Sequence, residues 1–237
     1  MPTSKPVRTK PSEEVSLKTQ LAVYGIGTFS TTTHFMLLVI VPIWARVNMG
    51  IPEGFTLGFV LGCRPLLSLF LSIHAGTLMD TLGTKRVLIF IGIMILTTPL
   101  MYPLLPYISA LILIQLLSGV CDSIGWMGAQ TLVGQVMHGR TKYAARLGAV
   151  IRSGHIIGPP AVGAVWDWSG PLAAFSLVAL SGVGFIVSVL MLPKSSARPI
   201  ELIESPETPR PPITFRSLMP RTTDYYDSFK LLASPTI

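Results

Sequence analysis

Three ionisable side chains lie deep inside long apolar runs of the sequence: Arg64, Asp122 and Arg152. A charge at the centre of a membrane-spanning helix costs roughly 2.5–3.5 kcal/mol on insertion scales, so each should face a protein interior or a watery cavity. Arg64 and Asp122 have opposite signs, and we expect them to pair. Two interpretations of this pair remain open: it belongs to a substrate or proton pathway, or it is an ion pair that fixes the register of two helices.

Two uncharged polar residues in the same runs extend the candidate pathway. His34 follows several threonines, and because an imidazole titrates near neutral pH it could carry protons; the alternative is a hydrogen bond across helices. Gln115 shares a run with Asp122. Arg152 is near enough to the end of its run for its side chain to reach the interface. The sequence has no nucleophile–base pattern, paired carboxylates or phosphate loop, so we expect no enzyme, metal or cofactor.

The runs that carry these residues have the length of membrane spans. Half of the 237 residues are hydrophobic and only 12% are charged, a composition typical of a membrane protein. A span needs roughly 20 apolar residues. Six runs meet this requirement and predict an all-α membrane protein: Leu17–Ala45, Thr56–Met79, Val87–Leu105, Ile108–Met137, Leu147–Val165 and Leu172–Leu192.

The basic residues between the runs predict an orientation. The net charge is +7, but lysine and arginine occur in short clusters without a continuous basic face, so nucleic-acid binding is not expected. One side of the predicted membrane holds nearly all of these bases, the other only Arg46; the first set is Lys5, Arg8, Lys10, Lys18, Lys85, Arg86, Arg140, Lys142, Arg146, Lys194 and Arg198. The excess of bases in cytoplasmic loops then places both termini in the cytoplasm.

The composition divides the chain into three parts. Residues 1–16 form a predicted cytoplasmic tail, residues 17–192 a transmembrane domain, and residues 193–237 a cytoplasmic linker that begins rich in proline. Within the linker, residues 222–233 combine a threonine cap, early acids and apolar residues at helical spacing, which indicates a short interfacial helix. The chain ends shortly afterwards, as if a further part should follow.

The loop between the second and third runs reads "GTLMDTLGTKR" and gathers several charges. Gly76 should allow close helix packing, and Gly83 should supply the positive φ that a very short reversal needs. The carboxylate of Asp80, at the end of a helix, needs a donor from elsewhere. Lys85 and Arg86 should hold the loop in the cytoplasm. The plain alternative is an ordinary charged turn.

This loop resembles the motif of the major facilitator superfamily, Gly-x-Leu-x-Asp-(Arg/Lys)-x-Gly-(Arg/Lys)-(Arg/Lys). Five positions match and two, Thr81 and Thr84, replace a base; the matches are Gly76, Leu78, Asp80, Gly83 and Lys85. The resemblance implies that the loop latches two halves of a transporter together, with Asp80 facing the second half.

The fifth run resembles a second motif of the same superfamily, the Gly-x-x-x-Gly-Pro-x-x-Gly pattern of its antiporter and drug-exporter branches. Gly154, Gly158, Pro159 and Gly163 match it. Gly154 and Gly158 lie on one helix face and should let another helix approach closely, so a simple packing face is the alternative. A third motif has an arginine four residues before a glycine in the fourth run; here Gln115 precedes Gly119, so that arginine's role does not carry over.

The resemblance covers residues 17–192 and implies half of a major-facilitator-type fold: six transmembrane helices in an inverted three-plus-three repeat within the plasma (inner) membrane. It is closest to multidrug and vesicular-amine exporters, in which a base also occurs in the second helix, as Arg64 does here. The implied function is alternating-access transport as an antiporter, with efflux of a small organic compound, cations included, coupled to protons. The expected partners are the lipid bilayer and a missing C-terminal half or a second copy. The alternative is a truncated, non-transporting membrane interaction protein.

Overall fold

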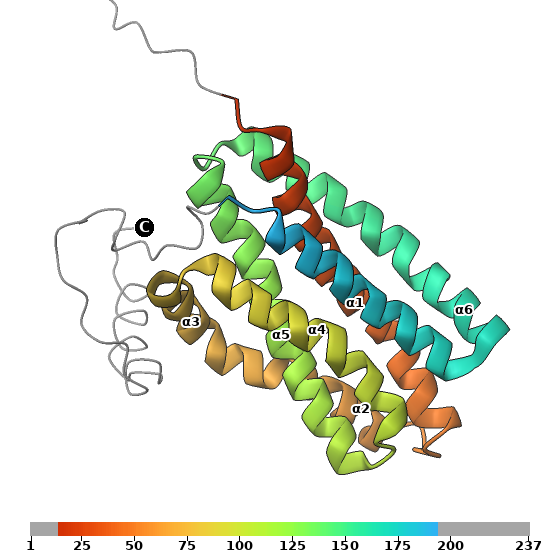
Figure 1. Cartoon of the computed structure of the whole chain (residues 1–237). Helices are drawn as coiled ribbons and strands as arrows, with labels where there is room; N and C mark the ends of the chain where they lie inside the picture. Colours follow the sequence, from red (N-terminus) through yellow and green to blue (C-terminus); the bar gives the residue numbers. More distant parts are fainter. Residues whose placement is uncertain (1–13, 194–237) are drawn as a thin grey trace, which may run out of the picture.

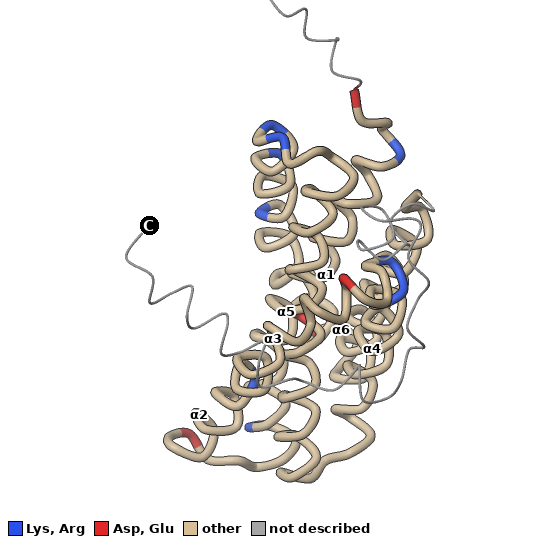
Figure 2. The backbone as a smooth tube through the Cα atoms, turned by 90° about the vertical axis from the view of Figure 1, so that its left-hand side faces the viewer, with Lys and Arg blue, Asp and Glu red and all other residues tan. Residues whose placement is uncertain are grey.

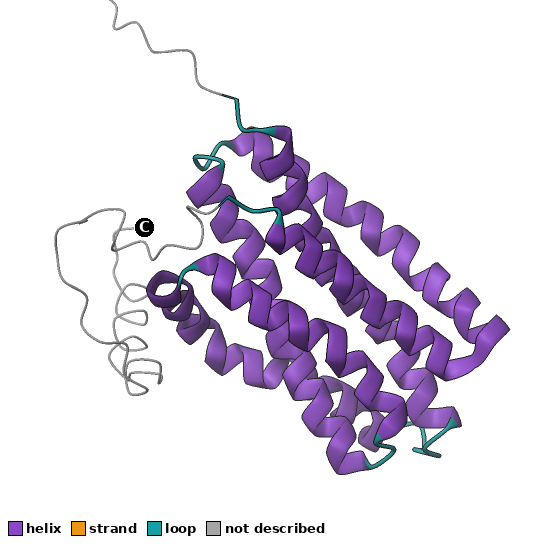
Figure 3. Cartoon of the chain, viewed as in Figure 1, coloured by secondary structure: helices purple, strands orange, loops and turns teal. Residues whose placement is uncertain are grey.

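Helices joined by short loops make up the part of the chain that the structure describes (Figure 3). A computed structural model describes residues 14–193 and contains no strand within them. The predicted tail, apart from its last residues, and the predicted interfacial helix lie outside the described residues.

The helices follow the apolar runs of the sequence. In chain order they are α1 (Leu17–Val47), α2 (Phe55–Gly62), α3 (Arg64–Leu82), α4 (Thr84–Leu104), α5 (Ile108–Val136) and α6 (Thr141–Leu190). Counted with α2 and α3 as one stretch, five helical stretches are long and apolar enough to cross a membrane. The second predicted run is thus two helices that meet at Cys63, and the fifth and sixth runs both fall within α6.

α6 is interrupted at Gly170, whose φ of 79° is non-helical, and Pro171 follows. Figure 1 shows the chain doubling back at the far end of α6. Both parts of α6 pack on α1: Gly154 before the break lies against Thr32, and Gly184 after it lies against Phe29. α4 packs on the returning part, and α5 packs between α1, α3 and α4.

The loop between α3 and α4 consists of a single residue outside the two helices, Gly83. Its φ is 88°, the left-handed conformation that the sequence predicts for a very short reversal. Lys85 then reaches across to the end of α6, where its Nζ donates to the carbonyl oxygens of Leu190 at 3.2 Å and Leu192 at 2.7 Å. A cation at a helix C-terminus satisfies carbonyls that have no helical partner. Lys85 therefore ties the loop to the last described helix.

Buried apolar side chains form two separate cores. The first core includes Ile26 of α1 and Cys121 of α5, and the second core includes Met36 of α1 and Ile114 of α5. Between these residues neither helix contributes a buried apolar side chain to either core. Figure 2 shows most charged residues near the ends of the helices and a largely uncharged middle. The few polar groups of the middle therefore lie between the two cores.

Candidate substrate and proton site

A polar layer separates the two apolar cores. We use this name for the polar side chains that α1, α3, α4 and α5 place between the cores, together with Tyr102, whose ring belongs to one core and whose hydroxyl contacts the layer: Thr33, His34, Arg64, Thr98, Tyr102, Gln115, Ser118 and Asp122. The layer crosses the bundle about midway along α1 and α5, where water is scarce. Each member should therefore be satisfied by another member or by a cavity.

Arg64 and Asp122 form the predicted ion pair. Arg64 begins α3 and is only 4% exposed, because the helix break at Cys63 brings its backbone against α5. Gly119 makes this approach possible: a Cβ there would lie 1.8 Å from the carbonyl oxygen of Arg64. Arg64 Nε lies 3.0 Å and Nη2 lies 2.5 Å from Asp122 Oδ2. The two charges are thus held together with both side chains mostly buried.

His34 is the third member of this cluster. Its Nδ1 lies 2.9 Å from Asp122 Oδ2, the same oxygen that receives both arginine N–H groups. The sequence predicted both residues as candidates but did not predict that they would be in contact. The structure joins α1, α3 and α5 through one carboxylate oxygen.

Gln115 extends the cluster to α4. Its Oε1 accepts from Arg64 Nη1 at 2.9 Å and from the hydroxyl of Tyr102 at 2.8 Å. The Tyr102 hydroxyl also lies 3.3 Å from Ser118 Oγ. Arg64 is therefore held by a carboxylate on one side and an amide on the other. Tyr102 was not predicted, because no motif distinguishes it from an apolar aromatic residue.

A cavity of about 310 Å³ opens beside the ion pair. Its walls come from α1, α5 and α6 and combine polar, aromatic and aliphatic side chains: Thr31, His34, Phe35, Asp122, Ser123, Trp126, Ile151 and His155. The ring of His155 packs on that of Phe35 with centroids 4.0 Å apart. Apolar walls with a few convergent polar groups are typical of small-molecule sites. Phe35, Trp126 and His155 are wall residues that the sequence did not single out for the site.

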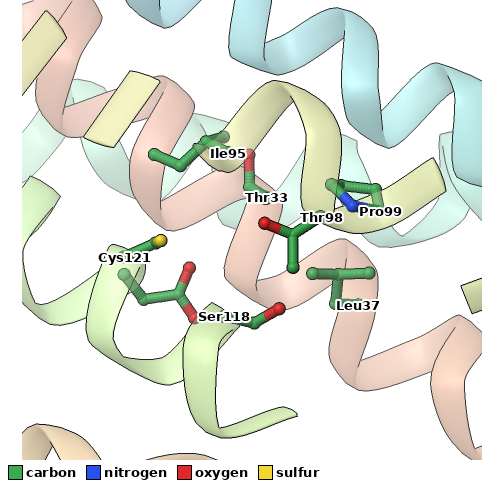
Figure 4. A pocket seen from close by; sticks show the side chains of 8 residues that line it. Thr33, Leu37, Ile95, Thr98, Pro99, Ser118 and Cys121 are labelled. Atoms are coloured by element: carbon green, nitrogen blue, oxygen red, sulfur yellow. The ribbon is translucent and has the colours of Figure 1, made fainter. Parts of the chain in front are cut away.

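Asp122 also borders a second, much smaller cavity of about 10 Å³, which is room for roughly one water molecule. Figure 4 shows Thr33, Thr98 and Ser118 around it, with Pro99 beside them. Pro99 has no N–H, so the carbonyl of Ile95 lacks its usual helical donor. Asp122 is the only residue common to both cavities.

The remaining predicted residues lie elsewhere. Arg152 is exposed on α6 and forms no ion pair with any residue of 14–193. The loop-motif residues gather at the junction of α3 and α4: Gly76, Leu78, Asp80, Gly83, Lys85 and Arg86. Gly76 has open space where a Cβ would lie, so within the described chain it is not a point of close helix packing.

The Gly-Pro motif of α6 faces α1 rather than the cavity. A Cβ at Gly154 would lie 2.1 Å from Thr32 Oγ1, and one at Gly158 would lie 2.7 Å from Thr32 Cγ2. Gly163, in contrast, has nothing within 4 Å of that position, and Pro159 follows Gly158 within the helix. The motif therefore provides a contact surface between α1 and α6, at the depth of the polar layer.

Replacing Gly154 by valine should lower the free energy of unfolding by about 1–3 kcal/mol, because the side chain must displace the Thr32 side chain. Gly163→Val in the same helix is the matched control and should be close to neutral. Cys63 and Cys121 are both buried, so a thiol-reactive dye reports unfolding on heating. Equal unfolding temperatures for the two variants would contradict a tight α1–α6 contact.

A bundle of helices long and apolar enough to cross a membrane, with a charged pair midway along it and a cavity beside that pair, is typical of an integral membrane transporter. The sequence matches the Major Facilitator Superfamily over residues 23–226, and the chain belongs to this family. It is a transporter family, in agreement with the expectation that the chain is not an enzyme.

Similar proteins include the Quinolone resistance protein NorA of Staphylococcus aureus strain MRSA252, which is 27% identical over 166 residues. The same protein from strain Mu50 / ATCC 700699 is 26% identical over 166 residues. In both cases the alignment covers 68% of this chain and 42% of the relative, so the chain spans less than half of these proteins.

Proposed function

We propose that the chain is the amino-terminal six-helix half of a transporter that moves a small organic solute by alternating access, with efflux in exchange for protons. Membership of a transporter family and the name of the resistance proteins it resembles support membrane transport and export. The proposed domains are the tail 1–16, the transmembrane domain 17–192 and the linker 193–237. The two parts of α6 on either side of Gly170 support a count of six spans in an inverted three-plus-three repeat.

The orientation belongs to the same proposal. Both termini lie in the cytoplasm, and the bundle spans the plasma membrane. Most bases at the ends of the described helices lie in the first turn of α4 (Lys85 and Arg86) and at the start of α6 (Arg140, Lys142 and Arg146). At the opposite end of the bundle Arg46, near the end of α1, pairs with Glu53. Bases concentrate on the cytoplasmic side of membrane proteins.

The observation that carries the proposal is the cavity of about 310 Å³ in contact with Asp122. A structural ion pair would need neither a cavity nor a third, titratable partner, and here the carboxylate has both. The cavity is open on one side of the described bundle. A second half, or a second copy of this chain, would close it and supply the surface against which the bundle rocks.

The alternative function is a non-transporting membrane protein that pairs with other helices. It is favoured by the long exposed apolar side chains of α2 and α3, among them Phe55, Phe59, Leu69 and Phe70. Lipid would cover such side chains as well as a partner would. The ion pair and the cavity have no part in this alternative, so a flux measurement distinguishes the two functions.

In vesicles that contain the full chain, an inward proton gradient should drive export of an organic cation such as ethidium. Asp122→Asn should abolish this flux, because Arg64 then faces a neutral amide and the cluster changes its net charge. Asp167→Asn, on an exposed residue of α6 outside the polar layer, is the matched control and should transport normally. Absence of proton-driven flux through the unmodified chain would favour the non-transporting alternative. Equal flux through both variants would instead remove Asp122 from the transport pathway.

A further inference from the structure

Asp122 is held in close contact with a buried arginine. Arg64 donates two N–H groups to Oδ2 and is 4% exposed, so its charge has no solvent to compensate it other than the carboxylate. Protonating Asp122 would leave a buried guanidinium without a counter-charge, which is strongly unfavourable. The contact with Arg64 therefore favours the ionised form of Asp122 and points to another group as the one that exchanges protons with the cavity.

His34 has the geometry for this exchange. Since the ionised Asp122 only accepts hydrogen bonds, His34 Nδ1 must donate to it. In the neutral imidazole Nε2 then carries a lone pair, and it has no hydrogen-bond partner among the described residues. The His34 side chain is 35% exposed and lines the cavity. A proton that arrives from the cavity thus binds at Nε2 without disturbing the contact with Asp122.

The helices packed around His34 contribute only a few other charged or titratable groups among the described residues. α3 contributes Arg64 and α5 contributes Asp122, which neutralise each other. α6 contributes His155, which also lines the cavity, and the exposed Arg152 one turn before it. The Nε2 of His155 is buried without a hydrogen-bond partner within residues 14–193. α4 contributes only Tyr102, which is turned to Gln115.

We infer that His34 is the residue at which a proton and an organic cation exclude each other in the cavity. When His34 is neutral, its Nε2 accepts an N–H of a bound ammonium group, and the aromatic wall residues Phe35 and Trp126 suit an organic cation. When His34 is protonated, Nε2 becomes a donor and the cluster gains one positive charge. The same atom then repels the ammonium group, so release of the cation and uptake of the proton are linked.

This inference rests on the proposed function and gives it a specific residue, whereas the sequence had suggested Asp122 as the group that holds either a proton or a cation. The test uses two fluorinated probes of the same shape, 4-(trifluoromethyl)benzylamine and the neutral 4-(trifluoromethyl)benzyl alcohol. Their binding to the full chain in nanodiscs is measured by ¹⁹F NMR line broadening at about pH 7.5 and pH 5.5, with empty nanodiscs as the background.

We expect the amine to bind severalfold more weakly at the lower pH, because a protonated His34 repels it, and the alcohol to change little. His34→Gln keeps an N–H donor for Asp122 and should make amine binding independent of pH. His74→Gln, on α3 and outside the cavity, is the matched control and should keep the full pH dependence. His155→Gln should also keep it.

Two results would overturn the inference: pH dependence that persists in His34→Gln, or pH dependence that disappears in His155→Gln. If His34→Gln does not fold, ¹⁵N-histidine NMR of the unmodified chain gives the same answer. The amine, and not the alcohol, should then lower the midpoint of the His34 titration, and an unchanged midpoint would refute the assignment. Absence of binding by both probes would instead refute the cavity as a substrate site, and with it the proposed function.

Discussion

Replacing Arg64 by leucine should destabilise the bundle by about 3–5 kcal/mol and abolish transport. The reason is that Asp122 loses its counter-charge. Its side chain is only 13% exposed and would keep a single hydrogen-bond donor among the described residues, His34. A buried charge that loses its partner must either stay ionised without compensation or take up a proton, and both cost free energy. Thiol-dye labelling of the buried Cys63 and Cys121 on heating measures the loss.

Two further variants separate the loss of the pair from the loss of a long side chain. Leucine at both positions, Arg64→Leu with Asp122→Leu, removes the lone charge and should regain much of the stability without regaining transport. Arg46→Leu removes an arginine from the exposed pair with Glu53, where the expected change is below about 1 kcal/mol. If the double variant were as unstable as Arg64→Leu alone, the packing of the arginine stem and not its charge would explain the effect.

The Arg64–Asp122 pair could be predicted from the sequence because charge in an apolar run is rare and demands an opposite charge. The two residues are 58 positions apart, and the approach of their helices follows from Gly119. The apolar runs likewise predict the helices, since a span of this length must satisfy its backbone internally. An unpaired charge and an unsatisfied backbone are both very costly inside a membrane. Few structures avoid these costs, so the ion pair and the helices could be predicted from the sequence.

The contacts of His34, Gln115 and Tyr102 could not be predicted in the same way. Apolar residues are spread around the whole circumference of α1 and α5, so no continuous polar face indicates how each helix is rotated about its axis. Whether an isolated polar residue points to lipid, to a neighbour or to a cavity depends on that rotation. Gly76 and Gly163 illustrate the same limit: each fits a motif, and each has open space beside it.

Gln115 occupies the position at which the superfamily motif has an arginine, and the structure shows what lies beside it. The superfamily motif that the fourth run resembles has an arginine at this position, and the sequence alone gives only its absence. In the structure the guanidinium of Arg64 arrives from α3 and donates to the Gln115 amide. A positive charge therefore still occupies this part of the bundle, supplied by a different helix.

Replacing Gly119 by alanine should separate Arg64 from Asp122 without removing either charge, and should abolish transport. The new Cβ would lie 1.8 Å from the Arg64 carbonyl oxygen and 2.7 Å from its carbonyl carbon. These are backbone atoms, which no rotation of a side chain can move away, so α3 must shift as a whole. We expect a loss of stability of about 1–3 kcal/mol.

Gly134→Ala in the same helix is the control, because no atom lies within 4 Å of its Cβ position, and alanine there should be neutral or slightly stabilising. The result of Gly119→Ala bears on how the site works, because the arginine and the carboxylate both remain. Transport at the normal rate would mean that the two charges need only be near each other. Loss of transport in a variant that still folds would mean that the close contact of both Arg64 N–H groups with one oxygen of Asp122 is required, and not only the presence of the two charges.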